Sequence, residues 1–240
     1  MGVIMFLERL KGEFGESLGR FNKSAPIQRV MSRDLGIEHY KALMRQIFHH
    51  TRENPQLQTL ATVHFRGSQR AVIKRFFKHA TSEIGHDQLA LNDLNSLGVD
   101  TSAMPLENPN PATMALISYP FYQIQYIDPV GYLGYLFFLE YTPTSQGRAY
   151  MEVLESVGVP RQSMTFLEEH ATVDVAHNKL METYVADLVR SEDQFQTVVY
   201  VMNVTAILYA TMIQSAFEQV DFPRDWGFSA SERAYPYPAS

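Results

Sequence analysis

The chain has 240 residues, of which 45% are apolar and 19% charged, so it can build a substantial core and is not intrinsically disordered. Its 20 basic and 26 acidic residues give a net charge of −6, which argues against nucleic acid or an anionic membrane as the main partner. The absence of cysteine excludes disulfides, thiolate metal sites and cysteine nucleophiles.

Apolar residues recur every three or four positions in several segments, which is typical of helices. No segment shows the strict alternation of a strand. Proline and asparagine residues over 100–111 predict a loop, and Pro129 and Pro143 predict helix breaks. Ser191, followed by two acidic residues, predicts the start of the last helix. The predicted helices span 36–53, 68–97, 112–127, 129–142, 144–157, 160–189 and 191–220.

These patterns predict one all-α domain of about seven or eight helices over residues 1–220. An irregular, proline-containing tail is expected over 221–240. The N-terminus lacks the features of a secretory signal. The apolar runs 132–141 and 198–213 are shorter than the roughly 18 residues that a membrane span needs. We therefore expect a cytoplasmic protein that does not enter a membrane.

Two of the predicted helices, 68–97 and 160–189, carry histidines and carboxylates at the same helical spacing. In each, three such residues lie at i, i+4 and i+7, which places them on one face of a helix. The two sets are His79, Glu83 and His86, and His170, Asp174 and His177.

A further carboxylate, Glu140, lies in the apolar run GYLGYLFFLEY. A carboxylate is costly to bury unless a cation pairs with it. Carboxylates and imidazoles without thiolates suit iron or manganese, and zinc is also possible. A site for two divalent ions is therefore predicted. Its expected ligands are Glu83, His86, Glu140, His170, Asp174 and His177. A ferritin-like fold fits less well, because it needs two E-x-x-H motifs and the chain offers one.

Three stretches in this order, SEIGHDQLALNDL, LFFLEYTP and EEHATVDVAHNKL, resemble the heme-oxygenase-like di-iron oxidases, which include the CADD-type proteins and the UndA-type decarboxylases. The resemblance extends over about 40–215. It implies a TenA-like helical bundle, two ferrous ions with the second bound weakly, dioxygen as co-substrate, and a homodimer. The position of the first carboxylate varies in that family. We interpret Glu83 as the ligand here. His79 is expected either to support the ligands without binding metal itself or to act as a substitute ligand.

The resemblance implies an oxidase or oxygenase that acts on a small carboxylic or amino acid in the bundle core. It leaves open C–C cleavage, N-oxygenation and self-modification of a tyrosine or lysine. No catalytic residue beyond the metal ligands is assigned. The clustered aromatic residues are mostly expected in the core, with Phe137, Phe166 and Met181 as candidate pocket-lining residues.

Other activities of the same fold are weighed against this one. The thiaminase-like route needs a cysteine nucleophile, which the chain lacks. A cofactorless quinone-forming oxidase would leave the carboxylates without a role. Heme oxygenase needs a histidine near the first helix, whereas the earliest histidine, His39, begins a later one. The remaining alternative is a TenA-like protein without metal chemistry that acts as a binding or partner module.

Overall fold

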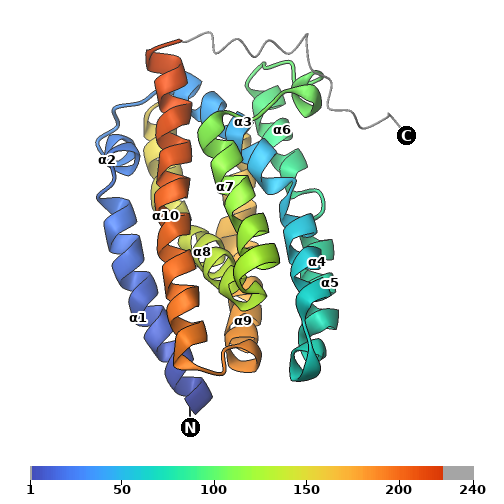
Figure 1. Ribbon diagram of the computed structural model, residues 1–240. Helices are drawn as coiled ribbons and strands as arrows, with labels where there is room; N and C mark the ends of the chain where they lie inside the picture. Colours follow the sequence, from blue (N-terminus) through green and yellow to red (C-terminus); the bar gives the residue numbers. More distant parts are fainter. Residues whose placement is uncertain (1, 224–240) are drawn as a thin grey trace.

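The chain folds into long helices joined by short turns (Figure 1). The computed structural model describes residues 2–223, except for the side chains of residues 2–4 and 173–176. No strand occurs within 2–223, and the predicted all-α class is confirmed. The helices are α1 (Gly2–Asn22), α2 (Ala25–Met31), α3 (Ile37–Thr51), α4 (Asn54–His64), α5 (Ile73–Glu83), α6 (His86–Ser96), α7 (Pro111–Tyr122), α8 (Tyr132–Ser156), α9 (Thr165–Leu188) and α10 (Glu192–Asp221).

Helix α8 forms the middle of the bundle and packs along α9 and α10. Its first half is buried on every face, since the residues from Tyr132 to Phe138 are buried in succession. A helix that is apolar all round belongs in the interior of a protein. Each large apolar side chain buried there stabilises the fold by about 1.5–3 kcal/mol. Glu140 lies two residues beyond Phe138 and is also buried.

The close approach of α8 to α10 depends on Gly134. A Cβ at this position would collide with the backbone carbonyl oxygen of Val198 and would lie 2.6 Å from the amide nitrogen of Met202. Both atoms belong to the backbone of α10, so no side-chain rotation can relieve the contact. Glycine is therefore required here by the spacing of the two helices.

Three helices were not predicted from the sequence patterns: α1, α2 and α4. In α1, Leu10, Phe14 and Phe21 are buried at helical spacing, so the signal is present in the sequence. The expected irregular tail begins at Asp221, which is instead the last residue of α10, and residues 224–240 lie outside the described chain.

The predicted helix over 68–97 is wrong, because the structure divides this segment. Residues Gly67–Val72 form a 3-10 helix, and a sharp turn then separates α5 from α6. At that turn Gly85 has a φ of +100°, a left-handed conformation that glycine adopts at little cost. His79, Glu83 and His86 therefore do not share one helix face, since Glu83 ends α5 and His86 begins α6.

The predicted break at Pro143 is also wrong, because α8 continues through this residue to Ser156. A proline inside a helix removes one backbone hydrogen bond and costs about 3 kcal/mol. Packing against α9 and α10 offsets this cost along the length of α8. By contrast, the predicted start of the last helix is confirmed, since the Ser191 hydroxyl accepts a hydrogen bond from the Gln194 amide at 3.2 Å.

Helix α10 is the one helix of the described chain that is long and apolar enough to cross a membrane, with a mean hydropathy of 1.4 over its most apolar stretch. It packs against α1, α3, α7 and α8 within the bundle. These contacts bury part of its apolar surface, while Tyr200 and Ile207 stay exposed.

Two consecutive histidines of α3, His49 and His50, are buried in the core. The His50 Nε2 lies 2.6 Å from the Tyr135 hydroxyl, whereas neither ring nitrogen of His49 has a hydrogen-bond partner among the described residues. Burial lowers the pKa of His50 to about 4. Burial, with the charges of Arg52 and Arg45, lowers the pKa of His49 to about 3. Both rings are therefore neutral in the folded protein at neutral pH.

We predict that Gly134→Ala lowers the free energy of unfolding by about 1–3 kcal/mol or more, since overpacking forces backbone shifts. Gly19→Ala in α1 is the matched control, because a Cβ there meets no atom within 4 Å. The control is expected to be neutral or to stabilise by about 0.5–1 kcal/mol. Urea denaturation of both variants measures the difference, and equal effects would contradict the close approach.

We also predict that the protein loses stability as the pH falls below about 6.5, where the unfolded state protonates His49 and His50 and the folded state does not. The loss is about 1.4 kcal/mol per pH unit for each histidine and ends near its lowered pKa. His49→Leu should make the decline shallower, because it removes one of the two groups. Chemical denaturation between pH 7 and pH 4 checks this. An unchanged pH dependence in His49→Leu would contradict the assignment.

Candidate metal centre

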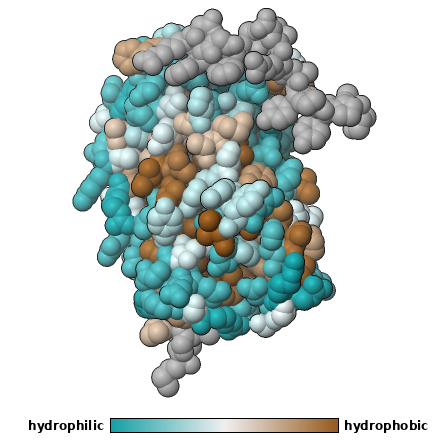
Figure 2. All heavy atoms as spheres, in the orientation of Figure 1, coloured by the Kyte–Doolittle hydropathy of each residue, from teal (hydrophilic) through white to brown (hydrophobic). Residues whose placement is uncertain are grey.

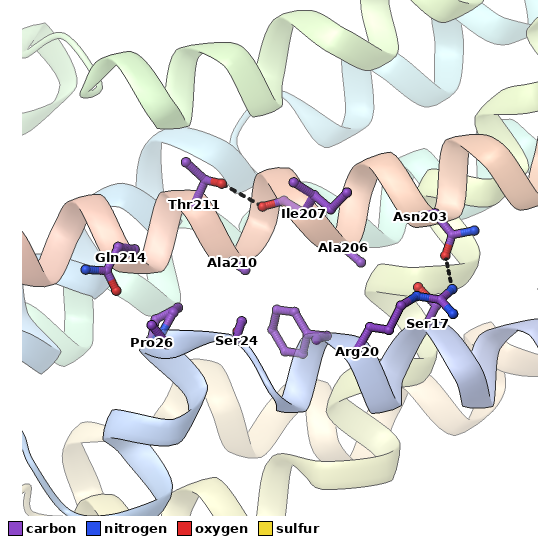
Figure 3. Close-up of a pocket in the computed structure, with 12 residues that line it drawn as sticks. Ser17, Arg20, Ser24, Pro26, Asn203, Ala206, Ile207, Ala210, Thr211 and Gln214 are labelled. Carbon is purple, nitrogen blue, oxygen red and sulfur yellow. Dashed lines mark hydrogen bonds between the residues drawn. The ribbon is translucent and has the colours of Figure 1, made fainter.

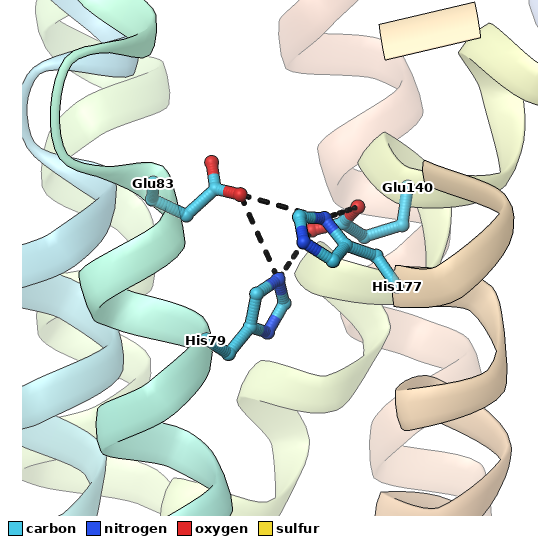
Figure 4. A group of neighbouring side chains, drawn as sticks. All are labelled: His79, Glu83, Glu140 and His177. Carbon is cyan, nitrogen blue, oxygen red and sulfur yellow. Dashed lines mark hydrogen bonds and ion pairs between the residues drawn. The ribbon is translucent and has the colours of Figure 1, made fainter. Parts of the chain in front are cut away.

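Four buried side chains from three helices converge in the interior (Figure 4). Helix α5 provides His79 and Glu83 one turn apart, while α8 provides Glu140 and α9 provides His177. The His79 Nε2 lies 3.1 Å from Oε1 of Glu140 and 3.7 Å from Oε1 of Glu83. The His177 Nδ1 lies 3.2 Å from Oε2 of Glu140 and 3.5 Å from Oε1 of Glu83. Each imidazole therefore faces both carboxylates. We call these four residues the first group.

Glu83 also belongs to a second group, with His86 and His170. Its Oε2 lies 3.5 Å from Nδ1 of His86, the first residue of α6. The rings of His86 and His170 are 4.8 Å apart between centroids. The turn at Gly85 is what places His86 beside Glu83, because it redirects the chain between α5 and α6. One carboxylate thus bridges two adjoining sets of potential donor atoms.

Both groups have the donor set of a site for a divalent cation. In each, one donor atom from every residue lies within 4.8 Å of the others. Two carboxylates buried side by side repel each other, and a cation between them removes that cost. Oxygen and imidazole donors without sulfur suit iron or manganese. The residues present therefore fit iron.

Hydrogen bonding to imidazole governs the charge of Glu140. Burial alone would raise the pKa of this carboxyl, but the contacts with His177 and His79 outweigh it, and the pKa is lowered. The side chain is therefore an ionised carboxylate at neutral pH. An ionised oxygen is the form that binds a metal.

The ring of His170 is oriented by its own helix. Its Nδ1 lies 2.7 Å from the carbonyl oxygen of Phe166, so Nδ1 carries the proton and donates it to that carbonyl. Burial lowers the pKa of His170, and nearby His86 lowers it further, against the effect of the Phe166 carbonyl. The ring is therefore neutral, with the Nε2 lone pair available to a ligand. A hydrogen bond to the other nitrogen is the usual way to orient a metal-binding histidine.

Five of the six predicted ligands come together in these groups: Glu83, His86, Glu140, His170 and His177. The sixth, Asp174, is on α9 between the two histidines, but its side chain lies outside the described residues. His79 lies in the first group, beside Glu83 and Glu140. Which of these residues bind metal stays a prediction.

Ser82 is a further polar neighbour that the sequence patterns did not single out. Its hydroxyl lies 3.3 Å from the His177 Nε2 and donates to the His79 carbonyl at 2.8 Å. A serine beside a candidate glutamate carries no distinctive sequence signal, so only the approach of α5 to α9 reveals this contact.

A small apolar cavity of about 100 Å³ adjoins the second group, with His170 and Phe166 in its wall. The other predicted pocket residues, Phe137 and Met181, are packed in the core and do not line this cavity. Phe137, for example, stacks on Tyr141, with 4.1 Å between the ring centroids. None of the described residues in the cavity wall is a lysine or arginine.

A second, larger cavity of about 380 Å³ lies between α1 and α10, with no member of either group in its wall (Figure 3). We call it the α1–α10 groove. Arg20 crosses part of it and donates to the Asn203 Oδ1 at 2.7 Å. Ser17 Oγ, Ser24 Oγ and Gln214 Oε1 are buried there without a hydrogen-bond partner among the described residues.

The remaining histidines lie elsewhere. His39 at the start of α3 lies 2.9 Å from the Asp221 carboxylate at the end of α10, so it is engaged in a contact between two helix ends. His64 ends α4 and is partly buried outside both groups.

The comparisons with known proteins agree with this architecture. A model of a family of iron-containing redox enzymes matches residues 41–210. A domain of unknown function with a heme oxygenase-like fold from Shewanella denitrificans superposes with a TM-score of 0.80 at 24% identity, over 90% of this chain and 93% of that one. A TenA homologue from P. horikoshii superposes with a TM-score of 0.71 at 8% identity, over 89% of this chain and 98% of that one. A TenA homologue from Pseudomonas syringae superposes with a TM-score of 0.70 at 13% identity, over 89% of this chain and 93% of that one. No curated protein matches.

Proposed function

Since the chain belongs to the family of iron-containing redox enzymes, we propose that it is a non-heme di-iron oxidase or oxygenase that uses dioxygen to oxidise a small carboxylic or amino acid. The observation that carries the proposal is the pair of adjoining His/Glu groups with Glu83 in common. A shared carboxylate between two sets of nitrogen and oxygen donors is an arrangement typical of two neighbouring metal ions.

In this proposal His79, Glu83, Glu140 and His177 hold the first ferrous ion. Glu83, His86 and His170 hold the second, with Asp174 as the further ligand that the sequence pattern predicts on α9. When bound, the two ferrous ions supply the electrons for the reduction of dioxygen.

The protein's own part is to fix the ligands and exclude water. The side chain of His79 is fully buried, and those of Glu83, Glu140 and His177 are less than a tenth exposed. Residues held by packing keep their geometry when a ligand arrives. The Phe166 carbonyl keeps the His170 ring turned with Nε2 outward from its own helix backbone.

The apolar cavity beside His170 supports an apolar substrate body. Among the described residues its wall offers no lysine or arginine to a carboxylate, so we propose that metal held by the two groups supplies the positive charge for the acid group. We therefore propose that the acid end of the substrate lies toward the ligand groups and its apolar part enters the cavity. The small volume of about 100 Å³ favours a small substrate.

We predict that the protein binds nearly two ferrous ions per chain under anaerobic conditions, and that Glu140→Gln and His177→Ala each weaken binding at least about tenfold by removing a donor. Stopped-flow absorbance after mixing with dioxygen, with a panel of fatty and amino acids, tests the oxidase reaction. A transient visible band with one substrate class would identify that class.

His64→Ala is the matched control for this experiment, because it removes an imidazole that belongs to neither group. It should retain iron and oxygen consumption. If the unaltered protein retains no iron, and His177→Ala behaves as His64→Ala does, the metal proposal is wrong.

We further propose a cytoplasmic homodimer that pairs through the face formed by α7 and α10. These helices pack side by side and expose large apolar side chains, among them Tyr122 on α7 and Tyr200 and Ile207 on α10. Figure 2 shows apolar atoms near the middle of this face. A cluster of exposed apolar side chains is typical of a protein interface.

We predict that Ile207→Lys shifts the protein toward the monomer, because a buried lysine at an interface is costly to desolvate. Val63→Lys on α4 is the control, since Val63 is similarly exposed outside this face. Sedimentation velocity over a range of protein concentrations measures the shift. A protein that is monomeric before any substitution would exclude the dimer.

The alternative function, a binding or partner module without metal chemistry, is supported by the α1–α10 groove. Its unpartnered hydroxyl and amide oxygens could hydrogen-bond a small polar ligand. The iron experiment separates the two functions. A binding module keeps its ligand affinity in His177→Ala, whereas the oxidase loses iron and oxygen consumption together.

A further inference from the structure

Asp93 is a fully buried carboxylate near the C-terminal end of α6. One of its oxygens, Oδ1, accepts hydrogen bonds from the Thr165 amide at 2.8 Å and the Thr165 hydroxyl at 2.6 Å. The other, Oδ2, accepts from the Phe166 amide at 3.1 Å and from the Tyr40 hydroxyl at 3.3 Å. Every donor to this carboxylate belongs to another helix, so the Asp93 side chain links α6 to its neighbours.

Two of these donors are the first two amides of α9, which no residue within a helix can satisfy. The residue at the N-cap position, Met164, has no side chain that could accept them. Asp93 therefore caps α9 from outside. Its negative charge also lies at the positive end of that helix dipole.

This cap joins the two helices whose histidines meet in the second group. His86 lies on α6 about two helical turns before Asp93. His170 lies on α9 little more than one turn after Thr165. Phe166 connects the two features directly, because its amide donates to Asp93 and its carbonyl accepts from the His170 Nδ1.

Hydrogen bonds through Ser163, just before α9, reinforce the same junction. The Ser96 hydroxyl at the end of α6 donates to the Ser163 hydroxyl at 2.7 Å. The Tyr40 hydroxyl lies 3.0 Å from the Ser163 carbonyl oxygen. The start of α9 is thus fixed to α6 and α3 by the Asp93 carboxylate together with these contacts through Ser163.

The first group has a separate support. It draws on α5 and α8, and only His177, farther along α9, comes from the capped helix. Between the cap and His177, α9 runs close to α8, where a Cβ added at Gly147 would lie 3.0 Å from the Ala171 Cβ. This packing supports α9 between the cap and His177, whereas the His170 ring is in addition linked to the cap through Phe166.

We propose that Asp93 is a positioning residue that sets α6 against α9 and thereby controls binding of the second metal ion by Glu83, His86 and His170, but not binding of the first. The inference rests on the proposed function, since it concerns metal at the same groups.

The test is an anaerobic titration with ferrous ion of the full-length protein, followed by near-infrared circular dichroism, whose bands report the ligands of each ion. The unaltered protein should bind two ions per chain. Asp93→Ala should keep the first ion and weaken the second at least tenfold, with loss of one set of bands. Asp93→Asn should bind the second ion with an affinity between those of the unaltered protein and Asp93→Ala. Its amide oxygen still accepts from Thr165, whereas its amide nitrogen cannot accept from Phe166.

Ser191→Ala is the matched control, because Ser191 caps α10, a helix that contributes to neither group. It should lower the melting temperature and leave both ions bound. If Asp93→Asn, compared at matched folded fraction, binds both ions like Ser191→Ala, or loses both ions together, the positioning role is wrong. If Asp93→Ala does not fold, Asp93→Asn alone decides. If the unaltered protein binds no ion, the proposed function fails, and this inference fails with it.

Discussion

The burial of Glu140 is the constraint on which the rest of the site depends. This carboxylate lies just beyond seven successive buried residues on the central helix and is almost wholly removed from water. It is stable there because His79 and His177 approach it from α5 and α9, at 3.1 and 3.2 Å. These contacts require three helices to meet at one point. The packing of α8 against α9 is therefore also what assembles the His/Glu groups.

The same helix shows how packing and chemistry are coupled in this fold. Gly134 lets α10 approach the apolar half of α8, where any side chain would meet backbone. The polar half begins just beyond it. The Glu140 side chain points to α5 and α9, where His79 and His177 contact it. Close packing thus limits where a cation and a substrate can lie.

Similarity of fold alone does not identify the reaction. The TenA homologues share the architecture at 8% and 13% identity, and the heme oxygenase-like domain at 24%. A common fold can hold unrelated activities, so the reaction has to be argued from the side chains. In this chain the described donors are carboxylates and imidazoles only, which directs the chemistry toward metal. The family of iron-containing redox enzymes is consistent with that direction.

The sequence by itself determined the helical class, the cap at Ser191 and most residues of the two groups, because periodicity and burial cost are local properties of a chain. Only the tertiary structure decided that α5 and α6 are separate helices and that α8 continues through Pro143. It also placed His79 beside Glu140. These outcomes depend on contacts between segments far apart in the chain, and such contacts override local preference. A spacing of residues can indicate which face they share, but the approach of another helix decides what that face meets.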